Sequence, residues 1–144
     1  MNKYYLFFAM LMISFGGFSQ KTKTMKNVDQ TIELSADVVS FFMKDKYTDA
    51  FESLMKYWPM PQNELADLQT QTVKYMNILD ARFGEKQAYS KVRNEVIEDF
   101  VIRETYLIRY EKSAIRLIFT YYKNDDGWIV NAFKWDDKFS EEFE

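Results

Sequence analysis

The 144-residue chain contains no cysteine and no histidine. Without cysteine it can form no disulfide, offer no thiol nucleophile and carry no lipid on a cysteine. Without histidine it lacks the base of Ser-His and Cys-His arrangements, the usual zinc ligands and the side chain that titrates near neutral pH. Any catalysis would therefore use carboxylates, tyrosines, lysines or arginines, so most hydrolase classes are disfavoured, and we expect no metal and no cofactor.

The chain also contains little glycine and carries only a small net charge. Four glycines leave no glycine-rich loop to cradle a phosphate, and the net charge of −3 gives no electrostatic reason to bind nucleic acid or anionic lipid. The one basic cluster, residues 21–26, is more typical of a solvated leader than of a binding patch. We therefore expect no nucleic-acid partner.

What the chain does have is an N-terminal segment with the pattern of a secretory signal. Lys3 is followed by an uncharged apolar run over Tyr4–Ile13, and small residues lead to Ser19. The alternative is an uncleaved anchor, but the run over residues 4–18 is interrupted and shorter than the roughly 20 residues that span a bilayer. We expect cleavage near Ser19, export to the periplasm or beyond, and no stable membrane insertion afterwards.

Removal of residues 1–19 leaves 125 residues, enough for one domain with a single core. Residues 20–27 are polar and lack periodicity, which predicts a flexible tether. The domain is expected over residues 28–136. Residues 137–144 are acidic and are expected to form a frayed tail.

Hydrophobic periodicity predicts three helices, over residues 28–43, 47–57 and 63–83. In the first, the predicted core face is the stripe Val28, Ile32, Ala36, Val39 and Met43, with a partner-binding groove as the alternative. In the third, Asn63 is the expected N-cap and Gly84 the terminating glycine. Between the second and third, Trp58–Pro61 stops the helix, and either plugs the core or contacts a ligand at a rim.

After Gly84 the period changes to two, which predicts four strands over residues 88–97, 100–110, 115–122 and 128–135. The first has a weak pattern, with Tyr89, Lys91 and Arg93 expected on one face. The segment Asn124–Gly127 is a strong hairpin signal. Short turns between consecutive strands predict an antiparallel meander, so the fold class is α+β: three N-terminal helices packed on a curved sheet of about four strands. Phe119 and Leu79 are expected in the common core.

Eleven of the 20 aromatic residues after position 19 lie between residues 100 and 143, so the sheet is aromatic on both faces. One face serves the core, and the other favours a second burial partner, either another copy in a homodimer or a small apolar ligand. Six aromatic residues are the candidate ligand contacts: Trp58, Tyr106, Tyr110, Tyr121, Trp128 and Trp135.

The element order, the segment Phe41–Phe51 and the closing strand Gly127–Phe133 resemble the cystatin-like α+β roll, and most of all exported bacterial members of the nuclear-transport-factor-two-like superfamily. The resemblance covers residues 28–135. It implies a conical fold with a cavity between the helices and the concave face of the sheet. No family motif aligns residue by residue, so no catalytic residue is implied, and the Gln-x-Val-x-Gly hairpin of cystatin inhibitors is absent.

Two functions follow as hypotheses. The first is an exported, non-catalytic binding or interaction domain, favoured by the missing catalytic residue types and the aromatic sheet. The alternative is an isomerase or cyclase in which a cavity carboxylate acts as base and tyrosine hydroxyls polarise a carbonyl. Its candidate acids are Glu95, Glu98, Asp99 and Glu104, and its candidate hydroxyls are Tyr106, Tyr110 and Tyr121. The simpler interpretation places Glu98 and Asp99 in a turn and pairs Glu104 with an arginine of a neighbouring strand.

Overall fold

The computed structural model describes residues 22–144, so the expected signal segment and its cleavage position lie outside the described residues. Three helices, α1 (Val28–Met43), α2 (Tyr47–Met55) and α3 (Gln62–Phe83), come first in this part of the chain. Four strands follow, β1 (Lys86–Ile97), β2 (Val101–Tyr110), β3 (Ala114–Asn124) and β4 (Gly127–Asp136), and then a short 3₁₀ helix, η1 (Phe139–Phe143). The predicted α+β class and element order are confirmed.

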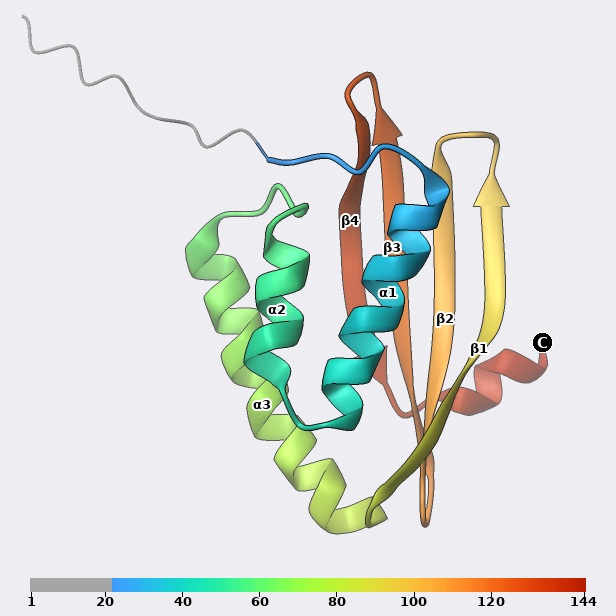
Figure 1. The fold of residues 1–144 in the computed structure, drawn as a ribbon. Coiled ribbons are helices and arrows are strands. Elements are labelled where there is room, and N and C mark those ends of the chain that lie inside the picture. Colours follow the sequence, from blue (N-terminus) through green and yellow to red (C-terminus); the bar gives the residue numbers. More distant parts are fainter. Residues whose placement is uncertain (1–21) are drawn as a thin grey trace, which may run out of the picture.

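The four strands form one antiparallel sheet in the order β1-β2-β3-β4, the predicted meander. Figure 1 shows the three helices on one face of this sheet, which we call the inner face, while the C-terminal segment crosses the opposite, outer face. The predicted β3–β4 hairpin is present: the Asn124 side chain accepts hydrogen bonds from the backbone of Asp126 and Gly127. Gly127 has φ +141, a value that side-chain-bearing residues rarely adopt. None of the helices in residues 22–144 has both the length and the apolar character needed to cross a bilayer.

Helix α1 begins where Asn27 caps it, with the Asn27 side chain accepting from the backbone N–H of Gln30. The predicted core stripe is wrong at its start, because Val28 and Ile32 are 41% and 39% exposed. Most of the buried residues lie one position before a residue of the predicted stripe, and two of them, Thr31 and Ser35, are polar. Thr31 is accommodated there because its hydroxyl donates to the Val28 carbonyl, and Ser35 by contacts described below.

Helix α3 begins at Gln62, so the predicted N-cap Asn63 is wrong: it lies inside the first turn, and the cap position is Pro61, which makes no side-chain cap hydrogen bond. The helix ends at Phe83 and is followed by the predicted Gly84, whose φ is +86. The turn before it leaves Trp58 only 5% exposed, in agreement with the plug interpretation. In the core, Phe119 is fully buried, as predicted, and packs against three other rings. Leu79 is only partly buried at the edge of the same core.

A β-bulge interrupts β1 between Lys91 and Arg93. Lys91 lies opposite Tyr106 and faces the helices, whereas Arg93 lies opposite Thr105 and faces outward. The prediction that Lys91 and Arg93 share a face is therefore wrong, because the extra residue at the bulge reverses the alternation.

Both ends of the expected domain also differ from the prediction. In the expected tether, Met25 is 2% exposed and pairs with Trp128 through two backbone hydrogen bonds of 2.8 Å, so it belongs to the core. The expected frayed tail is folded over the outer face, because carboxylates of Glu141 and Glu142 pair with Arg116.

Candidate functional site

A fully buried carboxylate, Glu104 of β2, lies beneath α1 at the centre of a hydrogen-bonded network. Ser35 donates to one Glu104 oxygen at 2.5 Å and Lys91 donates to the other at 2.6 Å. The Tyr121 hydroxyl lies 2.6 Å from Ser35 Oγ. Since the only proton of Ser35 is used on Glu104, Tyr121 is the donor in that contact. We call these four residues the Glu104 network.

Tyrosines in and beside this network stay protonated at physiological pH. Burial is the main reason that the pKa of Tyr106 is raised to about 12, and the nearby charge of Glu104 adds to it. Burial also raises the pKa of Tyr121, and the nearby charge of Glu104 adds to the effect. Both hydroxyls can therefore donate a hydrogen bond, and neither can act as a base near neutral pH.

A second buried cluster forms around Lys86, whose side chain is 6% exposed. Its ammonium pairs with Asp45 and Asp80, bonds the Tyr47 hydroxyl at 2.8 Å and lies 5.6 Å from the Tyr110 ring centre. Burial raises the pKa of both tyrosines, and the two aspartates reinforce the effect. The cluster joins the α1–α2 turn to α3, β1 and β2, which is a stabilising role.

The other three candidate acids lie away from any tyrosine of the core. Glu98 and Asp99 lie in the exposed β1–β2 turn, as predicted. Glu95 lies on the outer face, 2.5 Å from Arg103, and this hydrogen bond lowers the pKa of Glu95. The expected arginine partner of Glu104 is wrong, because the neighbouring strand supplies Lys91 instead.

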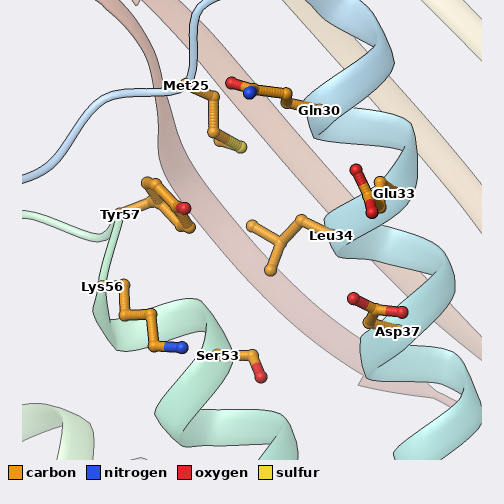
Figure 2. Close-up of a pocket in the computed structure, with 8 residues that line it drawn as sticks. All are labelled: Met25, Gln30, Glu33, Leu34, Asp37, Ser53, Lys56 and Tyr57. Carbon is orange, nitrogen blue, oxygen red and sulfur yellow. The ribbon is translucent and has the colours of Figure 1, made fainter.

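One cleft, of about 250 Å³, lies between α1 and α2. Figure 2 shows Glu33 and Asp37 of α1 across it from Ser53 of α2 and from Lys56, the residue after α2, with Leu34 between them. The remaining lining residues are Met25, Gln30 and Tyr57. Its surface is mostly polar and open to water, so it offers little apolar area to a ligand.

A second cleft, of about 330 Å³, lies between α3 and β4, and we call it the Trp135 groove. Its lining residues are Leu68, Gln71, Thr72, Tyr75, Phe133, Lys134 and Trp135. The Tyr75 and Trp135 ring centroids are 6.1 Å apart and the ring planes meet at 54°, so the two rings pack against each other and form one aromatic side of the groove. The Trp135 indole N–H donates to the Thr72 hydroxyl at 3.1 Å, and this bond fixes the ring orientation.

Two of the six candidate ligand contacts line clefts. Trp135 lines the groove named after it, and Trp58 lines a wider depression of about 840 Å³ beside the start of α3. The other four candidates, Tyr106, Tyr110, Tyr121 and Trp128, are at most 4% exposed and line none of the clefts described here. The four buried residues serve the core rather than a surface site.

The outer face carries the exposed apolar residues that the aromatic sheet predicts. Near the β1–β2 turn, Ile97 is 61% exposed, and Phe100 packs its ring 6.2 Å from that of the exposed Tyr122. At the other end of the same face, a cleft of about 190 Å³ lies under the C-terminal segment beside Arg93 and Arg116. A homodimer through this face stays a prediction.

Sequence reasoning missed Ser35, Lys86 and Tyr75, and it assigned no role to Thr72, which lies on the same buried face of α3 as Met76. Ser35 occupies a helix position where a polar residue usually faces water, and only its partners on the sheet bring it inside. Tyr75 carries a detectable signal, since it lies one residue before the core residue Met76 and adds an aromatic beside the core stripe of α3.

Comparisons with protein-family models, with curated proteins and with solved structures gave no match for this chain. Membership of the nuclear-transport-factor-two-like superfamily therefore stays a prediction. Within residues 22–144, no three acidic side chains are grouped closely enough to hold a metal ion.

Proposed function

We propose that this chain is an exported binding domain without catalytic activity, and that it takes a small ligand with a flat apolar surface in the Trp135 groove. The observation that carries the proposal is the lining of the groove: aromatic and aliphatic walls with a few polar groups at fixed positions. Ligand sites in proteins commonly have this composition and volumes of about 300–1,000 Å³. The groove, at about 330 Å³, is at the small end of that range.

The polar groups define what kind of ligand fits. Tyr75 is 49% exposed, so its ring is available to stack on a planar molecule. Gln71 is exposed at the rim and can donate or accept a hydrogen bond. A flat apolar body with one hydrogen-bonding substituent matches these groups.

The alternative isomerase chemistry has weaker support. Its acid and tyrosine do lie close together, since Glu104 and Tyr121 both contact Ser35. However, both Glu104 oxygens are occupied, and neither residue lines any of the four clefts. A substrate would have to separate α1 from the sheet to reach them.

The test uses 8-anilinonaphthalene-1-sulfonate, a planar apolar dye with one negative charge, whose fluorescence rises in apolar surroundings. We expect saturable binding to the purified chain. Replacing Tyr75 by alanine should weaken binding by about two- to tenfold, since an aromatic contact is worth about 0.5–1.5 kcal/mol. Gln71→Trp, which fills the groove from its exposed rim, should abolish binding.

The matched control is Tyr122→Ala, which removes a comparably exposed tyrosine from the outer face. It should leave dye binding unchanged. If Tyr122→Ala weakens binding and the two groove variants do not, the dye binds the outer face and the proposed site is wrong. Absence of saturable binding would contradict the proposal altogether.

A further inference from the structure

The C-terminal segment lies on a row of arginines on the outer face of the sheet. Arg116 of β3 is 6% exposed and contacts three carboxylates, those of Asp136, Glu141 and Glu142, each at 2.7 Å. Arg93 of β1 adds a contact of 3.0 Å to Glu142. The hydrogen bond with Arg116 also lowers the pKa of Asp136. Asp136 is the last residue of β4, so the C-terminal segment itself supplies the carboxylates of Glu141 and Glu142 to these two arginines.

The segment is held mainly by charge and hardly at all by apolar burial. Helix η1 contains no buried residue, and Phe143 is 87% exposed. Glu141 keeps half of its side chain in water. Glu142 alone is largely covered, with 11% of its side chain exposed, so its pairs with Arg93 and Arg116 are the main contacts that hold the segment. The arginines are therefore built into the sheet, whereas residues 137–144 can be displaced from them.

We propose that Arg93 and Arg116 form a docking site for an acidic peptide segment of another protein, and that residues 137–144 occupy this site in competition with it. The chemistry of the partner follows from the segment already bound. Two adjacent carboxylates, as in Glu141-Glu142, match the two guanidinium groups, and arginine binds carboxylates with two directed hydrogen bonds. This site lies on the face opposite the Trp135 groove, so the inference does not depend on the proposed ligand.

Competition with the bound C-terminal segment lowers the apparent affinity for such a partner. A segment tethered next to its own site has an effective concentration of about millimolar. An acidic peptide supplied from outside must therefore compete with a local millimolar rival, and it binds weakly to the native chain. Any change that weakens the contacts of residues 141 and 142 should raise its apparent affinity.

The experiment measures fluorescence anisotropy of a labelled synthetic peptide with the sequence of residues 137–144. The protein is the full chain carrying Glu141→Gln and Glu142→Gln, which keeps its length but loosens its own segment. We expect this variant to bind the peptide at least about tenfold more tightly than the native chain does. Adding Arg93→Gln to the variant should reverse the gain. Arg93 is chosen over the buried Arg116 because its side chain is 31% exposed, so the replacement should not unfold the protein.

The matched control carries Glu33→Gln and Asp37→Gln, which removes the same two charges from exposed positions on α1. It should bind the peptide no better than the native chain. Equal gains in both double variants would show that only net charge matters and would overturn the site. The proposal is also wrong if the loosened variant gains no affinity, or if a peptide with glutamine in place of both glutamates binds equally well.

Discussion

Removing either partner of the buried ion pair between Glu104 and Lys91 should destabilise the protein, and the two losses should differ in size. Replacing Lys91 by methionine leaves a fully buried carboxylate without a counter-charge, because the Glu104 side chain is 0% exposed. Removing one partner of a buried pair costs about 3–5 kcal/mol. Replacing Glu104 by glutamine leaves an ammonium whose side chain is already 30% exposed and can turn to water. That change should cost less, about 1–3 kcal/mol.

Urea unfolding at pH 7, followed by tryptophan fluorescence and by circular dichroism, measures both variants. Total stability for a domain of this size is about 5–15 kcal/mol, so the Lys91→Met loss is a large share of it. Adding Glu104→Gln to Lys91→Met should restore part of the lost free energy of unfolding, and a double-mutant cycle measures this recovery as a coupling free energy. A Lys91→Met cost below about 1 kcal/mol, typical of surface pairs, would refute the burial of this network. A larger cost for Glu104→Gln than for Lys91→Met would do the same.

Three further predictions concern the core and the pH range of stability. Phe119→Ala should cost about 3–5 kcal/mol in urea unfolding, and Leu79→Ala should cost clearly less because Leu79 is only partly buried; equal costs would mean that the core is placed wrongly. The pKa of Tyr106 is raised to about 12 in the folded protein, so its protonated hydroxyl stabilises the folded state fully below the ordinary tyrosine pKa near 10. This stabilisation is lost as the pH rises to about 12. Thermal melting at intervals over about pH 9–12 should show the melting temperature falling, and a constant melting temperature would contradict the prediction. The pKa of Asp136 is lowered by its hydrogen bond with Arg116, so this contact stabilises the folded chain above the ordinary carboxyl range and is lost as the pH falls below it. An NMR titration of the Asp136 side chain should give a midpoint below the ordinary value of about 3.9, and a midpoint at that value would count against the ion pair.

The sequence predicts the helices and the strand order because their apolar periodicities are long and consistent. It fails where polar residues are buried. Thr31 and Ser35 occupy the core face of α1, so the apolar stripe through Val28 and Ile32 lies one residue away from the true face. Hydrophobic patterning cannot detect a buried serine, because what makes its burial favourable is Glu104, 69 positions away in the chain.

The candidate site shows the same limit. Trp135 is a predicted ligand contact and lines the groove, but the side of the groove facing it comes from α3. Residue spacing along the chain does not say which helix covers which strand. The bulge in β1 is a second example. It sends Lys91 to the buried network and Arg93 to the outer site, although two residues apart on a regular strand they would share a face. The ends of the domain, at Met25 and at Glu142, are fixed by contacts with distant strands and not by local pattern.

The proposed binding of a flat apolar ligand in the Trp135 groove can be followed at the Trp135 ring itself. The chain has three tryptophans, so an NMR spectrum of the ¹⁵N-labelled protein contains three side-chain indole N–H signals, and Trp135→Phe assigns the one from the groove. Titration with 8-anilinonaphthalene-1-sulfonate should shift the Trp135 signal progressively and leave those of Trp58 and Trp128, which are 5% and 4% exposed, in place. Shifts confined to Ile97, Phe100 and Tyr122, with Trp135 unmoved, would contradict the account.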